Sequence, residues 1–184
     1  MTKFKVTVGN CERDLNLVRG DKISYYSFNM LGDSVLNREA AKQLVKLVDT
    51  SIDVIVTIES KAIALAQEMS TLLGHPRYVV IRKAKKSYMS NVVSVCGNTI
   101  ISGEANYFLN GEDVDYLQGK RILVLDDVIS TGGTIDATCR LLNKCGLSVV
   151  QFACVLCEGK VTTEFNGVPV VSCGFIPLVE NKND

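Results

Sequence analysis

The sequence has no excess of charge of either sign, because its 20 lysine and arginine residues are balanced by 20 aspartate and glutamate residues. A protein whose main partner is nucleic acid or an anionic membrane usually carries a strongly basic surface. We therefore expect neither nucleic acid nor a membrane to be the main partner.

Long apolar runs are also missing. No stretch approaches the roughly 18 apolar residues that span a bilayer, and the N-terminal MTKFKVTVGN lacks the apolar core of a signal peptide. These absences predict a cytoplasmic protein. Internal repeats and low-complexity tracts are absent as well, so we expect one domain over residues 1–184, of which 47% are hydrophobic.

Zinc ligands are scarce. His75 is the only histidine, and Cys154 and Cys157 have the spacing of half a zinc site without a second pair. A zinc site is therefore disfavoured. The seven cysteines are an odd number scattered over the predicted strands and helices, a distribution that predicts reduced, buried thiols acting as small hydrophobic side chains.

Strand and helix patterns alternate through the middle of the chain. Apolar runs predict buried strands at 53–58, 78–81, 122–125, 148–156 and 169–172. Helical spacing of apolar residues predicts helices at 34–49, 63–73 and 135–142. This order is typical of an α/β doubly wound parallel sheet, which binds ligands at the carboxyl ends of its strands.

Two segments depart from this alternation. Residues 3–28 read as short alternating strands separated by turns, which predicts a small β-rich hood over residues 1–30. Residues 82–118 begin with a basic cluster and continue with polar alternating segments. They predict a flexible two-stranded excursion that leaves the sheet.

The stretch RILVLDDVISTGGT, residues 121–134, combines the features of a phosphate site. An apolar strand ends at Asp126 and Asp127, and before the next helix comes a loop with Ser130, Thr131, Gly132, Gly133 and Thr134. Glycine lets the backbone approach a ligand, successive amides form an anion nest, and the helix adds its positive end. Two carboxylates would repel a bare polyphosphate, so a sugar phosphate with a nearby divalent cation fits better.

The sequence motif LVLDDVISTGGT resembles the signature of type I phosphoribosyltransferases, which bind phosphoribosyl pyrophosphate (PRPP). The resemblance implies that Asp126 and Asp127 act in catalysis by holding the ribose hydroxyls, and that residues 130–134 hold the 5-phosphate. It also implies Mg²⁺ as cofactor, associated with PRPP and these two carboxylates, and a homodimer.

Two other loops resemble the pyrophosphate-binding parts of this family. VTIESKAIALA matches its pyrophosphate loop, and IRKAKK resembles the basic entry to the mobile lid that closes over PRPP. A charge run of this kind is otherwise most often a solvated surface. The resemblance assigns Lys83 to catalysis as well, and pyrophosphate binding to Glu59, Ser60, Lys61, Arg82, Lys83 and Lys86.

The acceptor base is less closely defined. Family members of the hypoxanthine-guanine type have an aspartate where this sequence has Ser130, so the chain resembles the adenine and xanthine groups. Adenine is the favoured acceptor, with xanthine or guanine as the alternative, and on this loop alone orotate stays open. Phe28 and Lys160 are the candidate base-binding residues, the latter offset by one position from a lysine of xanthine enzymes.

The activity that the resemblance implies is transfer of the 5-phosphoribosyl group from PRPP to a purine in purine salvage, giving a nucleoside monophosphate and pyrophosphate. The alternative of another class is a non-catalytic purine regulator that senses PRPP. Such regulators carry an added DNA-binding helical segment and a basic surface, whereas this sequence begins in β-like segments and has no net formal charge. The enzyme is therefore favoured.

Overall fold

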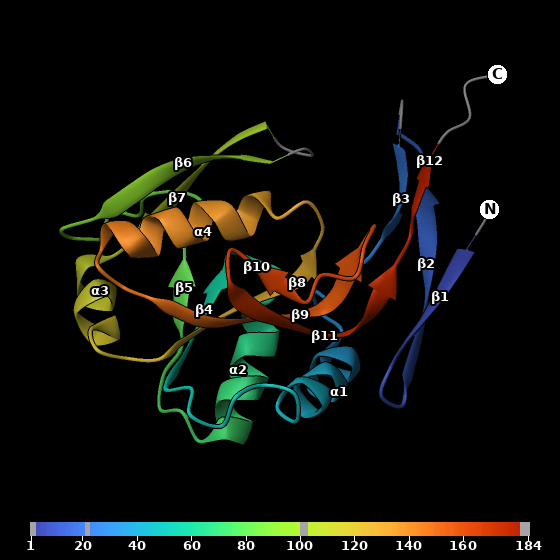
Figure 1. Cartoon of the computed structure of the whole chain (residues 1–184), viewed down its shortest axis with the longest axis horizontal. Coiled ribbons are helices and arrows are strands. Elements are labelled where there is room, and N and C mark those ends of the chain that lie inside the picture. The colour runs from blue at the N-terminus through green and yellow to red at the C-terminus, as the bar shows by residue number, and fades with distance from the viewer. Residues whose placement is uncertain (1–2, 21–22, 100–102, 181–184) are drawn as a thin grey trace.

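The computed structural model describes residues 3–20, 23–99 and 103–180. Its body is a six-stranded sheet in the order β10-β11-β9-β8-β4-β5 (Figure 1). All neighbouring strands run parallel except the short β10 at one edge, which confirms the predicted parallel sheet. The strands are β4 (Val54–Ile58), β5 (Val79–Ile81), β8 (Ile122–Ile129), β9 (Val149–Glu158), β10 (Glu164–Phe165) and β11 (Val168–Ile176).

Helices cover both faces of this sheet (Figure 1). On one face α1 (Ser34–Leu44) and α2 (Ile63–Leu73) share an apolar core with the strand residues Leu125 and Val155. On the other face α4 (Gly133–Lys144) packs with Val124 and Phe152. The fold is therefore doubly wound, as predicted. None of the described helices is long and apolar enough to cross a membrane.

The predicted N-terminal hood is a separate antiparallel sheet. It contains β1 (Lys3–Val8), β2 (Cys11–Val18) and β3 (Ile23–Ser27), with β12 (Leu178–Glu180) as a fourth strand beside β3. Alternate residues of β1 and β2 point inward, and Val6, Val8 and Leu15 join the core that covers α1. The sequence did not predict β12, which adds a strand from the other end of the chain.

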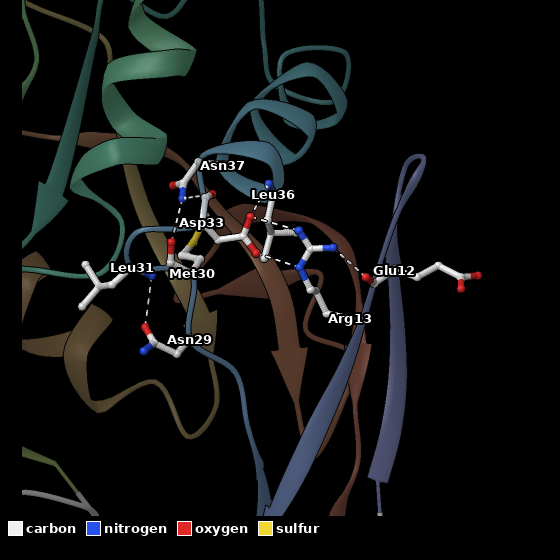
Figure 2. Close-up of polar contacts among 8 residues, drawn as sticks. All are labelled: Glu12, Arg13, Asn29, Met30, Leu31, Asp33, Leu36 and Asn37. Carbon is white, nitrogen blue, oxygen red and sulfur yellow. Dashed lines mark hydrogen bonds and ion pairs between the residues drawn. The ribbon is translucent and has the colours of Figure 1, made fainter.

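The hood is tied to the body at the start of α1 (Figure 2). Arg13 of β2 donates to both carboxylate oxygens of Asp33, over 2.7 Å from Nε and 3.0 Å from the terminal nitrogen. Asp33 also caps α1 by accepting from the Leu36 amide at 3.0 Å, and the Arg13 hydrogen bond lowers the pKa of this carboxyl. The Asn37 side chain donates to the Met30 carbonyl at 2.7 Å. These bonds fix the linker between hood and body.

The predicted excursion is an antiparallel ribbon of β6 (Val93–Thr99) and β7 (Gly103–Leu109), followed by α3 (Gly111–Leu117). The ribbon lies against α4, where Arg140 donates to the Cys96 carbonyl at 3.0 Å. A Cβ on Gly97 would lie 2.6 Å from the Cβ of Ala137, so this close approach requires glycine. The ribbon leaves the sheet as predicted, and its mobility stays a prediction.

The cysteines are all free. Cys11, Cys154 and Cys157 are buried, in agreement with the prediction of buried thiols, whereas Cys139, Cys145 and Cys173 are only partly buried. Cys96 is exposed on β6, so the prediction is wrong there, because this strand belongs to the ribbon and only one of its faces lies against α4.

Candidate active site

The acidic pair lies near the carboxyl end of β8. Asp127 is 7% exposed and Asp126 is half-buried. The Asp127 amide donates to Asp126 Oδ1 at 2.9 Å. Burial, together with the negative charge of Asp127, raises the pKa of Asp126 well above its usual range, and the positive charge of Lys83 acts in the opposite direction. The acidic pair and the basic loop after β5 therefore share one electrostatic environment.

Lys61 joins three parts of the chain. Its Nζ lies 3.3 Å from Asp127 Oδ2 and donates to the Phe28 carbonyl at 3.3 Å. The Lys61 side chain is 47% exposed, so the ammonium also faces solvent. This residue, predicted to bind pyrophosphate, lies where the loop after β4, the acidic strand and the end of the hood meet.

The loops after β4 and β5 are joined by Glu59. These two strands are parallel neighbours, so their carboxyl ends lie at the same edge of the sheet. Arg82 lies 3.2 Å from Glu59 Oε1, and the Lys83 amide donates to Glu59 Oε2 at 3.0 Å. The peptide bond between Glu59 and Ser60 is cis. Three of the residues predicted to bind pyrophosphate are thus in direct contact.

The loop between β8 and α4 is built for close approach of an anion. Gly132 has φ 87°, in the left-handed region, and α4 begins at Gly133 with no side chain of the described residues capping its first amides. Free first-turn amides and the helix dipole favour a bound anion. Phe165 of β10 packs on this loop, because a Cβ on Gly132 would lie 2.6 Å from its ring.

The two candidate base-binding residues are less clearly placed. The Phe28 side chain is 4% exposed and belongs to the core between hood and body, so its ring is covered by protein in this structure. Lys160 is exposed in the loop after β9 and forms no hydrogen bond or ion pair with the described residues. The roles of both in base binding stay predictions.

The remaining predicted residues differ in how far they are exposed. Ser60 and Thr131 are exposed, whereas Ser130, Thr134 and Lys86 are partly buried, and the Lys86 amide donates to the sulfur of Met89 at 3.3 Å. The contacts with the Phe28 carbonyl and with Phe165 were not predicted. The sequence gives no signal for a contact through a backbone carbonyl. Phe165, in contrast, is an apolar residue between the predicted strands at 148–156 and 169–172, so it was a candidate for contact with a neighbouring loop.

Asp126 and Asp127 are the carboxylates of this site that could hold a divalent cation. No cluster of three or more histidine, cysteine, aspartate or glutamate side chains could hold a metal ion in the described ranges. Magnesium in phosphate-handling sites typically keeps several waters and binds through one or two carboxylates together with substrate phosphates. Asp126 and Asp127 supply such a pair.

Comparison with known proteins gives one family. The family described as the phosphoribosyl transferase domain matches residues 33–174. A hypoxanthine/guanine phosphoribosyltransferase of Methanococcus voltae is 34% identical over 151 residues, which cover 80% of this chain and 77% of the relative. A protein of the same name from Methanothermococcus okinawensis is 36% identical over 155 residues, or 83% and 81% of the two chains.

Solved structures show the same fold. The adenine phosphoribosyltransferase of Thermoanaerobacter pseudethanolicus superposes with a TM-score of 0.69 at 20% identity and covers 88% of this chain and 95% of its own. The APRTase of Giardia lamblia in complex with 9-deazaadenine gives a TM-score of 0.71 at 18% identity, with 88% and 93% coverage. At this level of identity the likeness concerns the fold alone.

Proposed function

Because this chain belongs to the phosphoribosyl transferase domain family, we propose that it transfers the 5-phosphoribosyl group from PRPP to a purine base. The products are a nucleoside 5′-monophosphate and pyrophosphate, as in purine salvage. The observation that carries this proposal is the meeting of acidic and basic groups at one sheet edge, with Lys61 Nζ lying 3.3 Å from Asp127 Oδ2.

The carboxylates of β8 hold the ribose in this proposal. Asp126 and Asp127 accept hydrogen bonds from the 2- and 3-hydroxyls and so fix C1 for attack by a purine nitrogen. Negative charge in this partly buried place also favours the positive charge of an oxocarbenium-like transition state. Attack on C1 from the face opposite the leaving group inverts its configuration.

The basic groups stabilise the leaving pyrophosphate. Lys61, Arg82 and Lys83 come from two loops that Glu59 joins, and Lys61 is also paired with Asp127. Each hydrogen bond to a charged phosphate contributes about 1.5 to 3 kcal/mol. Asp126 and Asp127 would hold Mg²⁺ together with PRPP, and the ion would neutralise negative charge on the phosphates.

The loop of residues 130–134 binds the 5-phosphate. Its hydroxyls, and the uncapped amides at the start of α4, offer donors to a phosphate. Binding of the 5-phosphate by residues 130–134 places the ribose next to Asp126 and Asp127, because the phosphate loop directly follows the acidic pair in the chain.

Two observations point to different purines. Ser130 stands where members of the hypoxanthine-guanine type have an aspartate, which favours adenine. The relatives at 34% and 36% identity are named hypoxanthine/guanine phosphoribosyltransferases, which favours a 6-oxopurine. The fold likeness to adenine enzymes at about 20% identity does not separate the two. We therefore keep hypoxanthine and guanine beside adenine as acceptors, with xanthine as a further alternative.

A panel of bases tests the activity. The purified protein is incubated with PRPP, Mg²⁺ and one of adenine, guanine, hypoxanthine, xanthine or orotate, and nucleotide and pyrophosphate are measured by chromatography. We expect a nucleotide with at least one purine and none with orotate. Binding of PRPP without turnover of any base would instead support the PRPP-sensing regulator, and absence of PRPP binding would contradict both functions.

A homodimer in the cytoplasm, without a nucleic-acid partner, completes the proposal. Two apolar side chains near the start of α1, Leu31 and Val35, are 50% and 62% exposed. Light scattering after size exclusion tests the prediction, and a monomeric mass would contradict it.

A further inference from the structure

Glu59 is an acidic residue among groups proposed to bind an anion. A carboxylate in contact with pyrophosphate would repel it, because like charges a few ångströms apart interact unfavourably. Both oxygens of Glu59 are already engaged by protein. Oε1 lies 3.2 Å from Arg82, and Oε2 accepts from the Lys83 amide over 3.0 Å.

We propose that Glu59 does not bind pyrophosphate but is a positioning residue, which holds Arg82 and Lys83 in the arrangement that binds it. This inference rests on the proposed function. It concerns how the site is assembled before the substrate arrives.

Arg82 is fixed from two sides. Its backbone exchanges two hydrogen bonds with Phe108 of β7, over 2.9 and 2.8 Å, which places it at the root of the ribbon. Its guanidinium is held by Glu59. An arginine side chain has about 2 kcal/mol of rotamer entropy, so fixing it in advance lowers the ordering that binding would otherwise require.

The same contact leaves donors of the Arg82 guanidinium without a protein partner, and the side chain is 29% exposed. Glu59 engages a terminal nitrogen, whereas Nε is buried and has no hydrogen-bond partner in the part of the chain that the structure describes. Buried polar atoms are nearly always paired in native proteins. A phosphate oxygen is the kind of acceptor that an arginine donor at this position would take.

Lys83 is held through its backbone, not through its ammonium. The amide is bound to Glu59, and the side chain is exposed. The positive charge of Lys83 counteracts the rise in the pKa of Asp126. Glu59 thereby fixes the backbone from which this ammonium extends.

The substitution Glu59→Gln separates positioning from repulsion, because the two predict changes of opposite sign. If Glu59 only repelled the anion, removing its charge would tighten the binding of PRPP and pyrophosphate. If Glu59 positions Arg82 and Lys83, binding weakens by about tenfold, the equivalent of one hydrogen bond to a charged group. Titration calorimetry with PRPP and with pyrophosphate, each with Mg²⁺, measures the change.

Two further variants complete the test. Glu59→Asp keeps the charge and shortens the side chain, so positioning predicts an intermediate loss of affinity and pure electrostatics predicts none. Glu12→Gln removes the same charge from an exposed ion pair of the hood, where Glu12 lies 3.0 Å from Lys5. We expect wild-type affinity in this control. Amide exchange at Lys83 gives a readout without substrate, and it accelerates in Glu59→Gln.

The outcomes distinguish this inference from the proposed function. A wild-type protein that binds neither PRPP nor pyrophosphate overturns the function itself. A wild-type protein that binds them, with equal or tighter binding in Glu59→Gln, overturns the positioning role alone. Should Glu59→Gln fail to fold, wild-type affinity in Glu59→Asp overturns the positioning role, and weakened affinity supports it.

Discussion

Asp126 and Asp127 are neighbours on β8, yet their environments differ. Asp127 is buried and pairs with Lys61, whereas Asp126 is half-buried and lies in the field of both Asp127 and Lys83. Their substitutions should therefore have different effects on activity and on stability.

For Asp127→Asn we expect a folded protein that has lost most of its turnover. Asparagine keeps the shape of the side chain but removes the charge that the oxocarbenium-like state requires, and loss of one such group lowers kcat about 10²- to 10³-fold. Steady-state kinetics and a thermal melt measure both properties. Near-wild-type kinetics would contradict the role assigned to Asp127.

Asp126→Asn should raise stability at neutral pH. The raised pKa of Asp126 means that the folded protein holds this proton more tightly than the unfolded chain. Stability from this group is therefore present at low pH and is lost as pH rises through the folded-state pKa. Thermal melts from pH 4 to 8 should show the variant melting above the wild type at pH 7, with a difference that shrinks toward the unfolded pKa of about 4. A variant that melts below the wild type at pH 7 would contradict this explanation.

At the scale of elements, the start of α1 tests how the hood is fastened. Asp33→Ala removes both the helix cap and the ion pair with Arg13, and loss of a cap costs about 0.5 to 2 kcal/mol. Urea denaturation should show a loss in this range. Asp33→Asn is the control, because asparagine also caps but carries no charge, and its loss should be smaller.

The loop before α4 tests the close packing of glycine against Phe165. Gly132→Ala places a Cβ against that ring at a left-handed φ, so we expect PRPP affinity to fall by tenfold or more, about 1.4 kcal/mol. Gly146→Ala imposes a left-handed φ of 71° with no atom within 4 Å. It controls for backbone strain alone, and equal loss of PRPP affinity in both variants would contradict the importance of the Phe165 contact.

Period and composition predicted the longer elements. The helix at 63–73 coincides with α2, because Gly74 ends it in the left-handed conformation. The helix predicted at 34–49 is shorter in the structure, where α1 ends at Leu44. Residues 45–47 form a turn, in which Leu47 continues the apolar pattern of the sequence but is 46% exposed. Strands as short as β10 and β12 show no period, and the partner of β12 lies about 150 residues earlier in the chain.

The sequence predicted where in the fold the site residues lie, but not which of them are in contact. Glu59, Lys61 and Arg82 follow parallel strands and the acidic pair lies near the carboxyl end of another, so the fold class alone places them at one edge. Which of them touch could not be predicted. The hydrogen bond from Lys61 to the Phe28 carbonyl depends on how the hood docks, and Glu59 acquires its partners only when β5 lies beside β4.

At the scale of the whole molecule, the hood depends on both ends of the described chain. β3 lies between β2 and β12, with Tyr25 opposite Leu178. Deleting residues 178–184 exposes one edge of β3, and we expect faster amide exchange across Ile23–Ser27 with little change in β4 or β8. Hydrogen exchange with mass spectrometry measures this, and unchanged protection of β3 would contradict the role of β12.

The placement of β12 also bears on how the protein is made. A ribosome delivers the chain from its N-terminus, and domains can begin to fold during synthesis. All strands of the body sheet, from β4 to β11, precede β12 in the chain, and only Pro177 separates β11 from β12. The hood strand β3 precedes the whole body sheet in the chain, whereas its neighbour β12 follows it. The hood is therefore completed only after every strand of the body sheet has been translated, so the junction through which Lys61 meets Phe28 borders a sheet built from both sides of the body.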